Sequence, residues 1–324
     1  MKSICGTVLV VLASLLAAAG ARGQADYPDR AIRILVGFPP GGPPDVAARL
    51  LADKFSEAWG KSVVVENVTG GGGNIAVDRA AKAAPDGYTL LMASNAIVIN
   101  PSLYERLPYD AARDLAPVSL AVAMPIILVV NNDVPARDVR QLISLARAPS
   151  GRLTFGHAGL GTPAQLAGEL FKARAAIDVQ PIPYRGMPLV LPDLLAGRIT
   201  MAFPNISVVL QFVRDGKVRA LAVTSPRRAA AVPDVPTMIE AGFPGFEASA
   251  WFGLMAPAGT PPAIIDKLSR ETARVLAAGE VRKRLDELGM EAIASSPAEF
   301  ASVITTETAQ WAKVIKDAGI KISE

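Results

Sequence analysis

The hydrophobic positions of the chain follow two periods that alternate along its length. Short apolar runs rich in β-branched residues predict strands, and the segments between them carry apolar residues at helical spacing. One helix is predicted to end at Gly60, because glycine suits the left-handed turn that follows a helix. Its apolar stripe consists of Val46, Leu50, Leu51, Phe55 and Trp59. The predicted strands are Ile32–Val36, Val63–Glu66, Thr89–Ala93, Pro125–Val130, Leu153–Phe155, Val179–Pro183, Ile199–Phe203, Val218–Val223 and Ser249–Met255.

Alternation of strands and helices is typical of α/β proteins, in which helices cover both faces of a mostly parallel sheet. The predicted strands are too many for one small sheet and suit two sheets of about four or five strands. Two segments, Leu120–Val130 and Glu247–Met255, run on without a helix and are predicted to cross between two lobes, with Trp251 at the hinge. The sequence therefore predicts an α/β fold of two mostly parallel sheets joined by two crossing strands. Lobe one is expected at residues 26–123 plus 250–324 and lobe two at residues 124–249.

The first 25 residues differ from the rest of the chain. Lys2 precedes an apolar stretch from Thr7 to Ala19, and Gly23-Gln24-Ala25 forms a small-residue cleavage site. This pattern predicts a secretory signal peptide over residues 1–25, and hence export to the periplasm. No later stretch reaches the roughly 18 consecutive apolar residues of a membrane-spanning helix.

Charge and the rare residue types exclude several classes of function. Cleavage would remove Lys2 and Arg22 and no acid, which lowers the formal charge from +3 to +1, and the remaining basic residues are scattered among acids. We therefore expect no nucleic-acid partner. Cys5 lies in the signal peptide and His157 is the only histidine, so we expect no metal site built from thiolate or imidazole groups. Residues 159–164 match the pattern G-x-G-x-x-A, but the next predicted strand lacks the acid of a dinucleotide site, and no cofactor is expected.

A stiff turn joins the first predicted strand to the first predicted helix. The stretch VGFPPGGPPDVAARL, residues 36–50, places Gly41 and Gly42 between two pairs of prolines. The glycine N–H groups could approach a bound group closely, Asp45 could cap the helix, and the positive end of the helix favours an anion. The prolines would fix this geometry before a ligand arrives. A plain strand-to-helix loop with a capping Asp explains the stretch equally well.

The same chemistry recurs halfway along the chain. The stretch LTFGHAGLGTPAQLAGELF, residues 153–171, predicts a strand, a glycine turn and a helix with Thr162 as N-cap and Pro163 at the first helical position. Residues 70–73 and the strand exit at Ser94 and Asn95 supply further backbone donors. Two such helix entrances, one in each lobe, could hold a small anion between them. Helix capping alone remains the alternative for each.

Catalysis is the weaker interpretation of the sequence. His157 could pair with a serine such as Ser94, but the chain has no G-x-S-x-G motif and no visible third partner. We therefore predict no catalytic residue. A secreted α/β hydrolase acting through His157 is kept as an alternative.

Long motifs spread over nearly the whole chain carry a resemblance to a known family. They are FPPGGPPDVAARLLADK, VVVENVTGGGGNIAVDRAAKAAPDGYTLL, INPSLYERLPYD, LAPVSL, PYRG, LAGRITMAFPNI, VRALAVTS, VPDVPTMIEAGFPGFEASAWFGLMAPAGTP and WAKVIKDAGIK. The chain resembles the Bug-type, TctC-like substrate-binding receptors of tripartite tricarboxylate transporters. The resemblance implies a two-lobed periplasmic binding protein of the Venus-flytrap type, type II-like, monomeric and not an enzyme. It would pass a small carboxylate to transporter membrane subunits: a dicarboxylate or tricarboxylate, an acidic amino acid or an aromatic carboxylate. A sensor for a membrane signalling partner is the other alternative.

The resemblance also implies which residues contact the ligand. They belong to the loops after strands in both lobes: Phe38, Pro40, Gly41, Gly42, Asp45, Ser94, Asn95, His157, Ala158, Gly159, Gly161, Thr162, Pro163, Tyr184 and Asn205. Four positions depart from the family pattern. His157 replaces a small hydroxyl residue, Gln165 a histidine, Pro44 a Thr or Ser, and Pro204 an Asp. The change at Pro204 removes an acid from the expected pocket wall, which would admit a further negative group or an apolar one.

Export predicts that residues 1–25 are removed before Asp26. Intact-mass measurement of the protein recovered from the periplasm should show the loss of these residues, and N-terminal sequencing should begin at Asp26. A recovered chain that still carries Lys2 would contradict the assignment.

Overall fold

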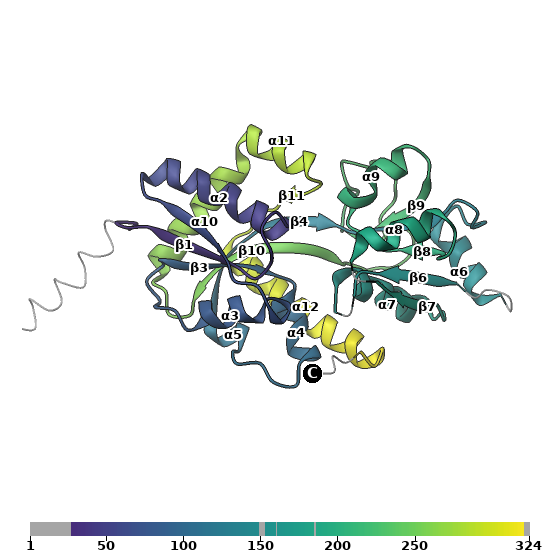
Figure 1. Ribbon diagram of the computed structural model, residues 1–324, viewed down its shortest axis with the longest axis horizontal. Coiled ribbons are helices and arrows are strands. Elements are labelled where there is room, and N and C mark those ends of the chain that lie inside the picture. Colours follow the sequence, from purple (N-terminus) through teal and green to yellow (C-terminus); the bar gives the residue numbers. More distant parts are fainter. Residues whose placement is uncertain (1–26, 149–152, 160, 185, 321–324) are drawn as a thin grey trace, which may run out of the picture.

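The computed structural model describes residues 27–148, 153–159, 161–184 and 186–320, which form the two lobes seen side by side in Figure 1. The predicted signal peptide, residues 1–25, lies outside the described part of the chain. Within the described residues the strands form one sheet of six and one of five, and helices flank both. We call the six-stranded sheet with its helices lobe one, and the five-stranded sheet with its helices lobe two.

Lobe one is built on a sheet with the strand order β11-β4-β10-β3-β1-β2. Its strands are β1 (Ile32–Val36), β2 (Val63–Asn67), β3 (Thr89–Ser94), β4 (Leu115–Pro125), β10 (Ser249–Pro257) and β11 (Glu291–Ala292). Its helices are α2 (Pro43–Trp59), the short 3-10 segment η1 (Gly71–Gly73), α3 (Asn74–Ala81), α4 (Ala96–Leu103), α5 (Ala111–Asp114), α10 (Pro262–Ala277), α11 (Gly279–Glu287) and α12 (Pro297–Asp317). The chain therefore builds this lobe from its two ends.

Lobe two is built on a sheet with the strand order β7-β6-β8-β5-β9. Its strands are β5 (Ile127–Asn131), β6 (Thr154–His157), β7 (Gln180–Pro183), β8 (Met201–Ala202) and β9 (Val218–Val223). Its helices are α6 (Val139–Arg147), α7 (Pro163–Ala175), α8 (Met187–Leu195) and α9 (Ile206–Arg214). The middle of the sequence therefore forms this lobe.

The two-lobed α/β architecture is confirmed, and each predicted strand overlaps a strand of the structure. The expectation of mostly parallel sheets is wrong in one respect. β1 pairs in parallel with β2 and β3, but β10 runs antiparallel to β3 and β4, and β5 runs antiparallel to β8 and β9. The parallel strands of each lobe end at the gap between the lobes. Because β10 and β5 enter their lobes from that gap, they must run against their neighbours.

The helix predicted from the first apolar stripe is confirmed as α2. Leu51 and Phe55 are fully buried in the core that α2 shares with β1 and α10. Gly60 ends the helix in the left-handed conformation, with φ of 61°, and its N–H donates to the carbonyl of Ser56. The local pattern was therefore sufficient to place this helix and its end.

The two crossings between the lobes are held together by Thr224. β4 continues into β5 through Ile126, and the chain returns from β9 to β10 through residues 224–248. The Thr224 N–H donates to the carbonyl of Ile126 at 2.9 Å, and the Thr224 hydroxyl donates to the carbonyl of Ala248 and lies 3.0 Å from the carbonyl oxygen of Ile126. We keep the lobe boundaries at residues 123/124 and 249/250 as a proposal, since the chain changes sheet near each of them.

Replacing Thr224 by valine keeps the shape of this fully buried side chain but removes its hydroxyl. The carbonyl of Ala248 then loses its donor, and an unsatisfied buried carbonyl costs about 1–3 kcal/mol. We expect Thr224→Val to lower the free energy of unfolding, measured by urea denaturation, by this amount.

Thr272→Val is the matched control. Thr272 is also fully buried, but its hydroxyl donates to the carbonyl of Leu268 four residues earlier within α10. That carbonyl already serves the helix, so the substitution should have a much smaller effect. Equal effects of the two substitutions would contradict a special role for Thr224.

Candidate ligand-binding site

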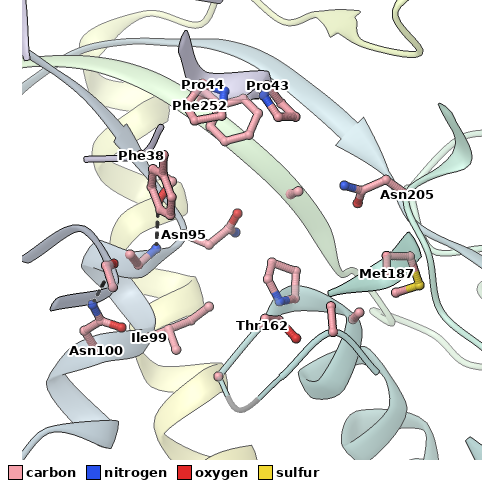
Figure 2. Close-up of a pocket in the computed structure, with 18 of the residues that line it drawn as sticks. Phe38, Pro43, Pro44, Asn95, Ile99, Asn100, Thr162, Met187, Asn205 and Phe252 are labelled. Atoms are coloured by element: carbon pink, nitrogen blue, oxygen red, sulfur yellow. Dashed lines mark hydrogen bonds between the residues drawn. The ribbon is translucent and has the colours of Figure 1, made fainter. Parts of the chain in front are cut away.

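A cavity of about 370 Å³ lies between the two lobes, and Figure 2 shows residues that line it. Lobe one contributes Phe38, Pro43, Pro44, Gly72, Ser94, Asn95, Ala96, Ile99, Asn100, Leu103, Tyr104, Ala250 and Phe252. Lobe two contributes Ala158, Gly161, Thr162, Pro163, Ala164, Met187, Asn205 and Val208. The volume is in the range of small-molecule sites. A ligand in this cavity would touch both lobes.

Five helices begin at the cavity wall. Their first residues or N-caps line it: Pro43 of α2, Ala96 of α4, Pro163 of α7, Met187 of α8 and Asn205 before α9. The parallel strands end at the gap between the lobes, so the helices that follow them start there. The N-terminus of a helix carries partial positive charge. The arrangement therefore favours an anion in the cavity.

The described part of the cavity lining carries no Lys, Arg, His, Asp or Glu side chain. Its polar side chains are neutral hydroxyls and amides, on Ser94, Asn95, Asn100, Tyr104, Thr162 and Asn205. Elsewhere in the described chain, no group of three or more His, Cys, Asp or Glu residues is placed to hold a metal ion. None of the described helices has the length and apolar character needed to span a membrane.

The helix entrance predicted in lobe two is confirmed in its capping. Thr162 is the N-cap of α7, and its hydroxyl accepts from the N–H of Gln165 and donates to the carbonyl of Gly159 at 2.7 Å. The Gln165 side chain in turn accepts from the N–H of Gly161 at 2.7 Å. Gly161 has a φ of +71°, and a Cβ there would collide with Leu103 of lobe one. The turn is therefore braced internally and touches the opposite lobe.

The helix entrance in lobe one differs from the prediction. The N-cap of α2 is Gly42, and Asp45 does not occupy that position. Asp45 reaches back and accepts from the N–H of Gly41 at 2.9 Å, while the N–H of Gly42 donates to the carbonyl of Pro39. Both glycine N–H groups are thus used within the loop. The expectation that they are available to a ligand is wrong, because the Asp45 carboxylate takes one of them and the carbonyl of Pro39 takes the other.

Asp45 is the electrostatic centre of that loop and is only 2% exposed. Its carboxylate also accepts from Arg49 and from Asn67, each at 2.9 Å. Burial acts to raise the pKa of Asp45, but the hydrogen bonds from Arg49, Gly41 and Asn67 together hold it below its ordinary value. Asp45 therefore stays ionised and fixes the loop instead of facing the cavity.

His157 is turned into its own loop and does not line the cavity. Its Nδ1 lies 3.1 Å from the carbonyl oxygen and 3.3 Å from the backbone nitrogen of Gly159. Burial lowers the pKa of His157 below its ordinary value, so the ring is neutral at pH 7. Ser94 belongs to the other lobe, and its hydroxyl accepts from the N–H of Ala96 at 3.3 Å. Nothing in this geometry pairs the two as base and nucleophile.

Tyr184 is engaged away from the cavity lining. Its hydroxyl donates to Asp193 at 2.7 Å, and Asp193 also forms an ion pair with Arg198 at 2.7 Å. Burial and the neighbouring Asp193 carboxylate raise the pKa of Tyr184 to about 12. The side chain therefore serves as a neutral donor within lobe two.

The structure brings together about half of the predicted contact residues. Those that line the cavity are Phe38, Ser94, Asn95, Ala158, Gly161, Thr162, Pro163 and Asn205. Those that lie outside its lining are Pro40, Gly41, Gly42, Asp45, His157, Gly159 and Tyr184. Of the four departures from the family pattern, only Pro44 reaches the cavity. Gln165 and Pro204 instead accept hydrogen bonds from backbone N–H groups.

The cavity lining also contains residues that were not predicted from the sequence, several of them from α4 and from the crossing strand β10. Ile99 and Leu103 stand one turn apart on α4, and Ala250 and Phe252 alternate along β10. Their spacing in the sequence is that of ordinary core residues. Only a family alignment or the assembled lobes could assign them to a cavity.

Asn95 connects the cavity to the hinge. Its side-chain oxygen accepts from the N–H of Trp251, and its amide nitrogen donates to Ser249 and to Glu307 of α12. The indole N–H groups of Trp251 and Trp311 donate to the same Glu307 oxygen, at 2.9 and 3.2 Å. Burial raises the pKa of Glu307 above its ordinary value despite these donors. The amide of Asn95 therefore ties α4 to β10 and α12.

Comparison with known proteins identifies a family with the same features. Residues 47–320 match the family described as the tripartite tricarboxylate transporter family receptor. Protein BugT of Bordetella pertussis is 38% identical over 320 residues, which cover 97% of this chain and 98% of BugT.

Two solved structures from Rhodopseudomonas palustris are similar in sequence and in fold. A protein solved with adipate is 36% identical, with a TM-score of 0.75, and the match covers 91% of this chain and 100% of that one. MatC, solved with bound malate, is 32% identical, with a TM-score of 0.70, and the match covers 89% of this chain and 100% of MatC. The likeness therefore spans both lobes.

Asp45→Asn should loosen the loop before α2. We expect it to lower the free energy of unfolding by about 1–3 kcal/mol at pH 7, because charged hydrogen bonds are lost. The pKa of Asp45 is lower in the folded protein than in the unfolded chain. Its stabilising contribution is therefore complete above the unfolded pKa of about 3.9 and is lost as the pH falls through the folded pKa.

Asp53→Asn makes the same charge change at an exposed position of the same helix and is the control. Urea denaturation of both variants between pH 7 and pH 3 should show a difference that shrinks toward acid for Asp45→Asn only. Parallel curves for the two variants would contradict the role of Asp45.

Proposed function

The chain belongs to the receptor family of the tripartite tricarboxylate transporters, and from this premise we propose that it captures a small carboxylate in the cavity between its lobes. Receptors bind and release solutes without changing them. The proposed ligand-binding residues are the described lining residues that offer polar groups, chiefly Ser94 and Asn205.

The convergence of five helix N-termini on one cavity is the observation that carries this proposal. Each N-terminus contributes about 0.3–1 kcal/mol of favourable interaction with a nearby anion. Hydroxyl and amide side chains add donors that orient a carboxylate. The described lining would hold an anion with dipoles and no fixed counter-ion, which suits a ligand that must later be released.

The relatives support a carboxylate over other anions. One similar structure was solved with adipate and another with malate, both of which are organic acids. The two ligands differ in length and substitution, so the family relationship supports the carboxylate group and leaves the rest of the ligand open.

We further propose that the protein acts in the periplasm and delivers its ligand to membrane subunits of a transporter. Residues of both lobes line the cavity, so a bound ligand favours the conformation in which it touches both. A membrane partner could distinguish the loaded from the empty receptor by this difference. No chemistry on the ligand is required.

A thermal-shift and calorimetry screen against a panel of carboxylates tests the proposal. A ligand at about 100 times its Kd should stabilise the protein by roughly 2.7 kcal/mol. Asn205→Asp places a carboxylate at the cavity and should weaken binding of the best ligand at least tenfold, because like charges repel strongly where water is scarce.

Asn132→Asp is the control, since it makes the same charge change at an exposed position of lobe two. It should bind the ligand as the unmodified protein does. A panel in which no carboxylate binds would overturn the proposed ligand class. Unchanged binding by a folded Asn205→Asp variant would show that the cavity is not the site.

A further inference from the structure

We propose that the ligand is a monocarboxylate with an apolar body, either an alkyl chain or a ring, and that this body lies against one wall of lobe one. The inference rests on the proposed function and narrows its ligand class. We call the surface formed by Phe38, Pro43, Pro44 and Phe252 the apolar wall; all four residues line the cavity. Figure 2 shows Pro43, Pro44 and Phe252 gathered on one side, with Phe38 near them and Thr162 across from them.

At the apolar wall, the N-terminus of α2 presents carbon atoms to the cavity where a helix usually presents N–H groups. A helix normally offers the free N–H groups of its first turn to an anion. In α2 the first two positions are Pro43 and Pro44, which have no N–H group. Their rings line the cavity instead. The N-terminus of α2 therefore contributes the positive electrostatic field of a helix end but few hydrogen-bond donors.

The two glycines of the loop offer no replacement donors. The N–H of Gly41 donates to Asp45 and the N–H of Gly42 donates to Pro39. Arg49 and Asn67, the neighbouring side chains with donor groups, are held by the same Asp45 carboxylate. A second carboxylate at the apolar wall would lose its water and find no partner among these groups, which disfavours it.

The aromatic residues of the wall are rigidly placed. Phe252 is a β10 residue that is only 7% exposed, and it pairs with Ser94 of β3. The Phe38 ring lies against Gly73, where a Cβ would be 3.5 Å from two ring atoms. Both rings are thus fixed before a ligand arrives, so apolar contact with them requires little further ordering.

The group best suited to a carboxylate is the amide of Asn205 in lobe two, where the positive ends of α7, α8 and α9 also line the cavity. The Asn205 side chain does not cap its helix, and Figure 2 shows it on the lobe-two side of the cavity. One end of a ligand would meet these groups while its other end meets the apolar wall. The division favours one charge and one apolar end over two charges.

Hexanoate and adipate form a matched ligand pair, because they share a six-carbon chain and differ only in whether the far end is a methyl group or a carboxylate. Calorimetry at pH 7 should show that hexanoate binds at least tenfold more tightly than adipate, and benzoate should show the same preference over the dicarboxylates succinate and malate. The protein is unfolded and refolded first to remove any solute carried through purification.

Pro44→Thr restores an N–H group and adds a hydroxyl at the apolar wall. It should tighten adipate binding at least fivefold and leave hexanoate binding nearly unchanged or weaker. Pro262→Thr makes the same change in the first turn of α10, outside the cavity lining, and should alter neither affinity. Far-UV circular dichroism and thermal melting verify that both variants fold.

The outcomes separate the inference from the function on which it rests. Tighter binding of hexanoate, with a shift toward adipate in Pro44→Thr, supports the apolar monocarboxylate. Adipate binding as tightly as hexanoate, or more tightly, overturns the inference and leaves the carboxylate receptor standing. Failure of every carboxylate to bind overturns both. If Pro44→Thr does not fold, the ligand pair on the unmodified protein decides alone.

Discussion

The structure depends on one topological constraint: the chain crosses between the lobes twice, and in each lobe the parallel strands end at the gap. Every helix that follows such a strand must then begin at the gap, with its positive end toward the other lobe. Five helices do so at the cavity. This geometry favours an anion in the cavity, and the described lining offers only neutral polar groups.

The same crossings join the cavity to the hinge through hydrogen bonds. Thr224 ties the outgoing segment at Ile126 to the returning segment at Ala248. On the cavity side, Asn95 bonds to Trp251 of β10 and to Glu307 of α12. Buried polar groups require partners, and these bonds supply them where the chain crosses between the lobes and beside the cavity. A ligand that touches the start of α4 therefore touches an element fixed to the hinge.

The two helix entrances have similar sequences but differ in their capping residues and in the groups that line the cavity. In lobe two the Thr162 hydroxyl caps α7 and Gln165 braces the turn. In lobe one Asp45 accepts from the N–H of Gly41, and the rings of Pro43 and Pro44 line the cavity. The difference lies in which side chain accepts from the backbone N–H groups of each loop, Asp45 in one and Thr162 in the other. The two similar loops therefore present different groups to the cavity.

The sequence by itself determined most of the strands, α2 with its end at Gly60, the Thr162 cap and both crossings, because each depends on periodicity or turn chemistry within a few residues; β11 and the first half of β4 were not predicted. Its motifs also indicated the family. Only the tertiary structure decided that β10 and β5 run antiparallel, that His157 faces its own loop, and that Ile99 and Phe252 line the cavity. These outcomes depend on partners far apart in the chain, as Asn67 is from Asp45. Local patterns fix the conformation of a segment, whereas the partner of a donor or the surroundings of a face are set when the segments assemble.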